Sequence, residues 1–371
     1  MPEGEATSNR EIHKLFHLMA KYGASDLHLK VGGAPVFRIA GALRSLELPP
    51  LAAAQVRRLL YDILTPEQVR TLESVGDVDL AYSVDDLTRL RINAYHQRGS
   101  LSIAARLVNV RIPSFDELHL PAGTMERISS FEQGLVIVAG VTGSGKSTTL
   151  AAMIEYINTT RRCHIVTIED PIEYLYADRR ALINQREVGI DVGSFRDALR
   201  YVVRQDPDVI LLGEMRDTET VQAGLSAAET GHLVFGTLHS STVSQTFSRM
   251  LDFFEPERQK QVRTGLQFNL RSIVCQKLLP SIKPGVSRIP ALEIMLVTPP
   301  IQKLIEQGDD SRILDVVKSS REEGMIDFNR SLYDLLQQGY IEREAAMAAS
   351  PSPQSLEANL QGVFVSASAL R

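Results

Sequence analysis

The chain has 371 residues, 44% of them hydrophobic, which is long for one domain and predicts two or three domains with buried cores. Its formal net charge of −5 argues against a broad basic surface, so we expect no nucleic acid partner. The two cysteines are too few for a disulfide framework or a four-cysteine zinc site. No apolar stretch has the length of a transmembrane span, and the polar, acidic N-terminus is unlike a signal peptide. We therefore expect a cytoplasmic protein that is not itself inserted in a membrane.

Residues 1–110 are expected to form a small α+β domain without a nucleotide motif of its own. Apolar residues at helical spacing between Ile12 and Met19, followed by Gly23, predict a helix. A second helix is predicted to begin at Thr65, with Pro66 at its first position. Strands are predicted at 26–30, 35–39, 79–84, 89–95 and 101–108.

Arginines are dense in the strands of this first domain, where apolar and β-branched residues are the usual choice, so they need partners. The arginines are Arg89, Arg91, Arg98 and Arg106. One possible partner is a nucleotide bound on another subunit, with arginine supplied in trans. The alternative is ion pairing within the domain, with Asp77, Asp79, Asp85 and Asp86.

A linker is expected at 111–122, a segment that contains Pro113 and Pro121. Beyond it strands alternate with helices, which predicts a parallel sheet with crossover helices over residues 123–280. Its strands are predicted at 135–139, 164–168, 209–212 and 233–237. Residues 281–371 are expected to be mostly helical, with helices at 299–307, 311–320, 328–338 and 342–349 and a partly disordered tail.

Residues 134–150 carry the motif around which the rest of the chain is organised. The apolar run at 135–139 is followed by G-x-x-x-x-G-K-S, the pattern of a phosphate-binding loop that opens a helix. Glycines let the backbone approach phosphate oxygens, which consecutive N–H groups and the helix N-terminus attract. We expect Lys146 to reach the β- and γ-phosphates of ATP and Ser147 to hold Mg²⁺. The predicted nucleotide-binding residues are Gly140, Val141, Thr142, Gly143, Ser144, Gly145, Lys146, Ser147 and Thr148.

Two further predicted strands end in carboxylates. In an open parallel sheet, ligands lie beyond the carboxyl ends of the strands, which places Glu169 and Asp170 near the phosphates. Glu169 is a candidate to orient or deprotonate a water, and Asp170 is a candidate metal ligand. At the Walker B position, 209–212, the usual acid is replaced by Gly213, with Glu214 one residue later. The alternatives are a solvated loop in the first case and an ordinary strand-to-helix turn in the second.

Histidines lie at both ends of the predicted strand 233–237. His239 follows its carboxyl end, a position that favours sensing the γ-phosphate over a structural role, whereas His232 precedes the strand and is the weaker candidate. Three further arginines recur at helical spacing, which places them on one face of a predicted helix. They could form a solvated stripe, or they could contact phosphate or a neighbouring subunit. They are Arg196, Arg200 and Arg204.

Together these stretches resemble the ATPases of type II and type IV secretion systems, and most closely their twitching-motility, PilT-like pilus retraction branch. The resemblance covers about residues 8–350. It is carried by ASDLHL at 24–29, GVTGSGKSTT at 140–149, TIEDPIEY at 167–174, DPDVILLGEMRD at 206–217 and TGHLVFGTLHS at 230–240.

The resemblance implies a PAS-like α+β domain followed by a RecA-like P-loop ATPase domain and a helical C-terminal region. It also implies a cytoplasmic homohexamer with ATP between subunits, held at the inner membrane by a pilus platform protein. By this likeness Glu169 and Glu214 are the catalytic carboxylates, His232 and His239 the His-box residues, and Arg98 and Arg106 the arginines supplied in trans.

Two features of the sequence distinguish between the branches of the family. Extension and type II secretion motors usually carry a longer N-terminal region and often a zinc site, which this chain lacks. The retraction motif AIRNLIRE is matched by PIQKLIEQ at 300–307, which keeps Leu304 and Ile305 but loses the arginines. An accessory, PilU-like role beside a paralogous retraction ATPase therefore remains open. A DNA-transfer ATPase of related fold and a non-enzymatic nucleotide-binding ring subunit are further alternatives, and the intact Lys146, Glu169 and Glu214 argue against the latter.

Overall fold

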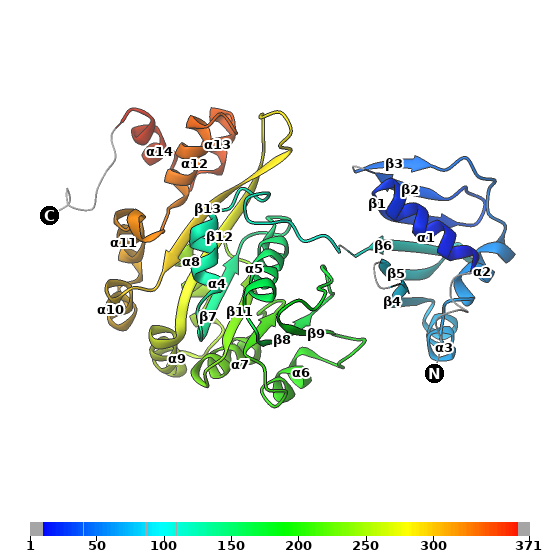
Figure 1. Cartoon of the computed structure of the whole chain (residues 1–371), viewed down its shortest axis with the longest axis horizontal. Coiled ribbons are helices and arrows are strands. Elements are labelled where there is room, and N and C mark those ends of the chain that lie inside the picture. Colours follow the sequence, from blue (N-terminus) through cyan, green and yellow to red (C-terminus); the bar gives the residue numbers. More distant parts are fainter. Residues whose placement is uncertain (1–9, 40, 86–87, 109, 363–371) are drawn as a thin grey trace. The chain divides into compact units, whose positions relative to one another are not determined.

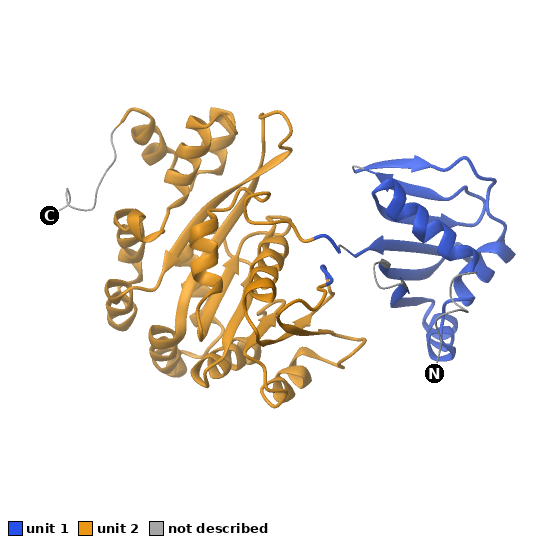
Figure 2. Cartoon of the chain, viewed as in Figure 1, with its two compact units in different colours: residues 1–111, 173–175 blue, residues 112–172, 176–371 orange. Residues whose placement is uncertain are grey.

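The computed structural model of the chain describes residues 10–39, 41–85, 88–108 and 110–362. The chain divides into two units (Figure 2): unit 1 comprises residues 1–111 and 173–175, and unit 2 comprises residues 112–172 and 176–371. Each unit has its own cluster of buried apolar side chains.

The elements of unit 1 are α1 (Glu11–Tyr22), β1 (Ala24–Lys30), β2 (Val36–Ile39), β3 (Ala42–Ser45), α2 (Ala53–Tyr61), α3 (Pro66–Val75), β4 (Asp77–Asp85), β5 (Thr88–Gln97) and β6 (Ser100–Leu107) (Figure 1). The strands form an antiparallel sheet in the order β3-β2-β1-β6-β5-β4.

The predicted helices and strands of unit 1 are confirmed, and β3 and α2 were not predicted. Helix α1 buries the apolar stripe that predicted it, including Ile12, Phe16 and Met19. Helix α3 begins at a capping box in which Thr65 and Gln68 satisfy each other's backbone N–H groups. The four residues of β3 are all exposed, so no alternation of apolar residues marks that strand in the sequence.

The elements in the first part of unit 2 are α4 (Ala122–Ser129), β7 (Gly134–Ala139), α5 (Lys146–Thr160), β8 (His164–Glu169), β9 (Leu182–Glu187), α6 (Phe195–Val202), β10 (Val209–Leu212), α7 (Thr218–Glu229), β11 (Leu233–Leu238) and α8 (Val243–Asp252). They are followed by α9 (Pro256–Asn269), β12 (Leu270–Pro280), β13 (Arg288–Leu296), α10 (Pro299–Gln307), α11 (Ile313–Ser319), α12 (Phe328–Gln337), α13 (Arg343–Ala349) and α14 (Pro353–Leu360), with short 3₁₀ turns at Asp310–Arg312 and Arg321–Glu323.

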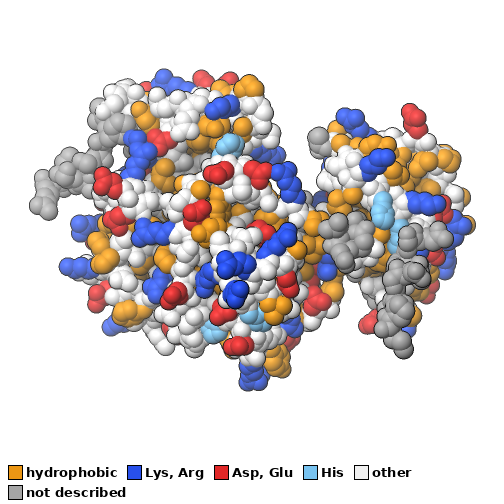
Figure 3. Space-filling view, viewed as in Figure 1, with side chains coloured by type: hydrophobic (Ala, Val, Ile, Leu, Met, Phe, Trp, Pro, Cys, Tyr) orange, Lys and Arg blue, Asp and Glu red, His pale blue; other side chains and the backbone are white. Residues whose placement is uncertain are grey.

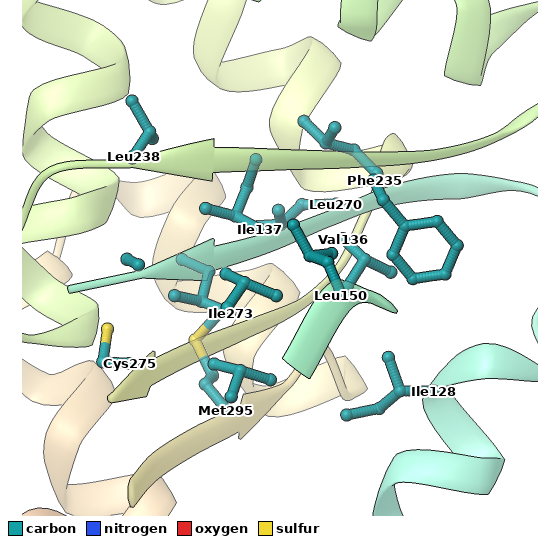
Figure 4. Close-up of a cluster of buried hydrophobic side chains, with 14 of the residues drawn as sticks. Ile128, Val136, Ile137, Leu150, Phe235, Leu238, Leu270, Ile273, Cys275 and Met295 are labelled. Carbon is teal, nitrogen blue, oxygen red and sulfur yellow. The ribbon is translucent and has the colours of Figure 1, made fainter. Parts of the chain in front are cut away.

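The strands of unit 2 form one sheet in the order β13-β12-β7-β11-β10-β8-β9, parallel except for β13. The predicted strands are β7, β8, β10 and β11, and every residue of β7, β10 and β11 is buried. Figure 4 shows side chains of adjacent strands and of α5, such as Ile137, Ile273 and Leu150, in one apolar cluster. Burial on both faces explains why these strands are continuous apolar runs.

The C-terminal part differs from expectation in two places. Residues 281–371 contain β13, which pairs antiparallel with β12, in addition to the predicted helices α10 to α13. The expected disordered tail contains α14, whose Leu356 is buried, while residues 363–371 lie outside the described part of the chain. In the described residues no helix is both long and apolar enough to span a bilayer. On the face drawn in Figure 3, basic and acidic side chains are interspersed.

Candidate active site

The candidate site lies in unit 2, where the carboxyl ends of four neighbouring parallel strands meet. The strands β7, β11, β10 and β8 are adjacent in that order. The loops that leave them carry, respectively, the phosphate-binding motif, His239, Glu214 and Asp170, while Glu169 is the last residue of β8. The parallel topology therefore brings together residues that are up to 99 positions apart in the sequence, from Gly140 to His239.

The phosphate-binding loop connects β7 to the N-terminus of α5, as predicted. Lys146 is the first residue of α5, and its buried Nζ donates to the carbonyl oxygens of Gly140, at 2.8 Å, and Val141, at 3.1 Å. Burial lowers the pKa of Lys146, and the nearby Glu214 carboxylate opposes that shift. Ser147 is exposed on the first turn of the helix, where its hydroxyl is accessible to a ligand.

Glu169 is buried and oriented by two neighbours. The hydroxyl of Thr167 donates to its Oε1 at 2.7 Å, and the Gln185 side chain of β9 donates to the same oxygen at 3.2 Å. Because Gln185 lies in a strand outside the recognised motifs, sequence reasoning did not find it. These contacts fix the direction of a carboxylate at the edge where a nucleotide would bind.

Glu214 lies at the centre of a charged cluster. Its Oε2 accepts from Arg216 at 2.7 Å and its Oε1 lies 3.2 Å from Nε2 of His239, while a second Arg216 nitrogen is 3.9 Å from Asp170. Burial acts to raise the pKa of the Glu214 carboxyl, but Arg216, His239 and Lys146 together hold that pKa below its ordinary value. Glu214 is therefore an ionised carboxylate at neutral pH. Sequence reasoning missed Arg216, although it lies two residues after Glu214 in the same motif.

Gly213, which occupies the usual position of the strand-end acid, lies close to the end of β8. Its N–H donates to the carbonyl oxygen of Ile168 at 2.8 Å, and a Cβ at this position would lie 3.1 Å from the same oxygen. A side chain at this position would therefore require the end of β8 to shift by a few tenths of an ångström, and in this chain the acid is carried by Glu214.

His232 is not part of this cluster. It precedes β11 at the opposite end of the sheet, separated from His239 by the six residues Leu233–Leu238, which span roughly 20 Å in a strand. Its Nδ1 lies 2.9 Å from the carbonyl oxygen of Ala227 and 3.1 Å from the hydroxyl of Thr230. Within one chain, His232 has a structural position at the end of α7, and only His239 lies beside Glu214.

The two arginines expected to act in trans differ in their surroundings in unit 1. Arg106 is ion-paired with Asp26 of β1 at 2.8 Å. Arg98 is exposed in the two-residue turn between β5 and β6, and it makes no ion pair with the described residues of the chain. Among the described residues no arginine pairs with Asp77 or Asp79, and both carboxylates accept from the amide of Asn93 instead. The other acids in that alternative are Asp85, whose side chain is not described, and Asp86, which lies outside the described residues.

The arginine stripe predicted at 196–204 is interrupted. Helix α6 ends at Val202, so Arg204 lies beyond it, while Arg196 pairs with Glu219 of α7 at 3.3 Å. Arg200 lines a surface groove between α6 and α7 together with Arg258.

A preformed metal cage is absent from the part of the chain that the structure describes, where no group of three acidic, histidine or cysteine side chains could hold an ion. The Ser147 hydroxyl and the carboxylates of Glu214 and Asp170 are hard oxygen donors of the kind Mg²⁺ takes. Because Mg²⁺ usually completes its shell with water and substrate phosphates, this sparse donor set fits it.

Comparison with known proteins gives consistent matches. The family model described as "Type II/IV secretion system protein" matches residues 2–340. The type IV pilus retractation ATPase PilT of Pseudomonas aeruginosa is 41% identical over 345 residues, which cover 93% of this chain and 99% of that protein. The type IV pilus ATPase PilU of the same organism is 38% identical over 346 residues, covering 93% and 90%. The crystal structure of the pilus retraction motor PilT with bound ADP has a TM-score of 0.86 at 42% identity, covering 94% of this chain and 99% of that one.

These matches cover almost the whole chain, and their sequence identity is well above the level at which two proteins share only a fold. They also agree with the motifs that meet at the edge of the unit 2 sheet. The chain therefore belongs to the type II/IV secretion system protein family, and within it is a PilT-like ATPase.

Proposed function

We propose that this chain is an ATP-hydrolysing motor that powers type IV pilus retraction as a homohexamer. The observation that carries the proposal is the meeting of Lys146, Glu169 and Glu214 at one edge of a parallel sheet. It is supported by 41% identity to PilT over 93% of the chain. In this proposal unit 1 is a PAS-like domain and the sheet of unit 2 is a RecA-like ATPase core.

In the proposed mechanism the loop at 140–147 holds the phosphates of ATP through its N–H groups and Lys146. Bound Mg²⁺ supplies positive charge to the phosphate oxygens, and Ser147 with Glu214 or Asp170 would hold it. Glu169 or Glu214 orients the attacking water and accepts its proton. His239, whose Nε2 lies 3.2 Å from the Glu214 carboxylate, is placed to respond to the γ-phosphate.

Conversion of this chemistry to mechanical work requires a neighbouring subunit. Arg98 or Arg106 of the next subunit stabilises the charge that develops on the transferred phosphate. Binding and release of nucleotide then rotate the two units about residues 111–122. The ring is cytoplasmic and acts at the inner membrane through a pilus platform protein.

The test is steady-state ATPase activity of the purified protein, with its mass measured by light scattering. We expect a ring-sized species whose hydrolysis is lost in Lys146→Ala, which removes nucleotide binding, and in Glu214→Gln, which keeps it. Glu219→Gln, an exposed change on α7, is the matched control and should hydrolyse ATP normally. A ring that binds ATP but turns over no faster than Glu214→Gln would instead support the regulatory, non-enzymatic alternative.

An accessory, PilU-like role is the second candidate, and the surface of α10 favours it. Helix α10 buries Ile301, Leu304 and Ile305, while the positions that carry arginine in the retraction motif are here Gln302, which is half-buried, and Glu306, which is exposed. The discriminating measurement is pilus retraction in cells that lack every other retraction ATPase. Retraction there supports an independent motor, and retraction only when a paralogous ATPase is present supports the accessory role.

A further inference from the structure

We propose that Gln276 of β12 is a positioning residue for the phosphate-binding loop. It holds the Ser144–Gly145 peptide in the orientation that the loop needs to bind nucleotide. The inference rests on the proposed binding of ATP and goes beyond it, because β12 contains none of the motifs that identify the site.

Two buried hydrogen bonds connect Gln276 to the loop and to the helix that follows it. Its Nε2 donates to the carbonyl oxygen of Ser144 at 2.7 Å, and its Oε1 accepts from the hydroxyl of Thr149 at 2.8 Å. Gln276 is 4% exposed and Thr149 is 1% exposed. Both polar ends of the amide are thus used inside the protein, which also fixes which end is the nitrogen.

The register of the sheet places Gln276 at this point. Strand β12 runs parallel to β7, with Cys275 beside Ala139, so Gln276 lies level with Gly140, where β7 becomes the loop. A polar residue is costly inside a buried strand unless both its donor and its acceptor are satisfied. Gln276 satisfies this condition, because the Ser144 carbonyl accepts from its Nε2 and the Thr149 hydroxyl donates to its Oε1.

The hydrogen bond to Ser144 controls the loop through the geometry of the peptide bond. In a planar trans peptide the C=O and the following N–H point in opposite directions. When Gln276 holds the Ser144 carbonyl towards β12, the Gly145 N–H must point away from β12. If this carbonyl were released, the peptide could rotate and withdraw that N–H from the nest that binds phosphate.

Gly145 leaves room for this contact. It has φ = +92°, a backbone conformation that favours glycine, and a Cβ at this position would lie 2.6 Å from Nε2 of Gln276. The glycine of the motif that precedes Lys146 therefore serves the approach of the Gln276 amide as well as that of phosphate.

The next residue of β12 provides a control, because successive side chains of a strand point to opposite faces. Lys277 donates from Nζ to the carbonyl oxygen of Ala349 at 2.6 Å and lies over the ring of Phe328 at 4.7 Å. A change at Lys277 disturbs β12 and its packing on the C-terminal helices without touching the phosphate-binding loop.

The test uses Gln276→Glu. This change keeps the shape of the side chain and the oxygen that accepts from Thr149, but it puts a carboxylate oxygen in place of the amide nitrogen that donates to the Ser144 carbonyl. Affinity for a fluorescent N-methylanthraniloyl derivative of ATP and the steady-state KM and kcat are measured on the full chain. Because a buried acceptor is left unpaired, we expect Kd and KM to rise about ten- to a hundredfold, with a smaller change in kcat. Thr149→Val should raise KM by a smaller factor, and Thr149→Ser, which keeps the hydroxyl, should restore it.

Lys277→Met should lower the melting temperature and leave KM unchanged. The inference is overturned if Gln276→Glu binds the ATP derivative as the wild type does, or if Lys277→Met raises KM as much as Gln276→Glu. If Gln276→Glu does not fold, the KM values of Thr149→Val and Thr149→Ser decide, and equal values for these two variants overturn the inference. A wild-type chain that binds no ATP derivative overturns the proposed function itself, which is a separate result.

Discussion

Arg106 of β6 donates from Nε to Oδ1 of Asp26, its cross-strand partner in β1, at a distance of 2.8 Å. The other carboxylate oxygen accepts from the hydroxyl of Ser25 at 2.7 Å and lies 3.6 Å from Arg38. The Asp26 side chain is only 11% exposed, whereas that of Arg106 is 69% exposed. A residue expected to act on a neighbour's nucleotide is thus also an anchor of its own domain.

Asp26→Asn should destabilise the chain by about 1–3 kcal/mol, because Ser25 and Arg106 lose a charged acceptor at a buried position. Burial acts to raise the pKa of Asp26, but Ser25 and Arg106 outweigh it and hold that pKa below the ordinary 3.8. The carboxylate therefore contributes stability above the unfolded-state pKa and loses it as pH falls through the lower folded-state value. Urea unfolding of the wild type and of Asp26→Asn should show a difference in the free energy of unfolding that becomes smaller as the pH falls. Asp79→Asn, on an exposed acid of β4, should change stability little, and a pH-independent difference for Asp26→Asn would contradict the assignment.

Arg98→Ala should lower kcat by roughly a thousandfold while leaving the ring and its nucleotide affinity intact, as expected for an arginine supplied in trans. Mixing Arg98→Ala subunits with Lys146→Ala subunits gives the sharper measurement. If the arginine acts in trans, some interfaces of the mixed ring regain both residues and activity reappears. Activity that stays absent in mixed rings would place Arg98 in cis, whereas normal activity of Arg98→Ala alone would place it outside the mechanism. Arg91→Ala on β5 is the control.

Arg216→Met should move the acidic limb of the kcat/KM profile to higher pH. Burial alone would raise the pKa of Glu214, and Arg216 is the first of the charges that lower it. Without the guanidinium the pKa of Glu214 rises, so the carboxylate needed for catalysis is protonated at a higher pH. Arg200→Met on α6 should leave the profile unchanged. An unshifted acidic limb in Arg216→Met would mean that Glu214 does not control that part of the profile.

Gly213→Asp would create the strand-end acid that most Walker B motifs carry, and here it should be harmful. The new side chain would displace the end of β8, because a Cβ added at position 213 would lie 3.1 Å from the Ile168 carbonyl oxygen. Overpacking of this kind costs about 1–3 kcal/mol. Thermal unfolding and ATPase activity should both fall, and Gly213→Ala should show the same loss of stability in weaker form. Normal activity in Gly213→Asp would show that β10 and β8 can separate without cost.

The sequence by itself determined the parts of this protein that depend on residues close together in the chain. The run from Gly134 to Leu150 specifies strand, loop and helix within 17 residues, so its pattern was sufficient to predict the phosphate-binding loop. The strands β10 and β11 were equally predictable, because burial on both faces makes them continuous apolar runs.

Tertiary structure alone decided which distant residues meet. Gln276 lies 132 positions from Ser144, and Arg106 lies 80 positions from Asp26, so no local pattern links either pair. His232 and His239 appear in one motif, yet a strand of six residues places them at opposite ends of the sheet. Strand order and register determine these distances, and both depend on how whole elements pack rather than on the residues within one of them.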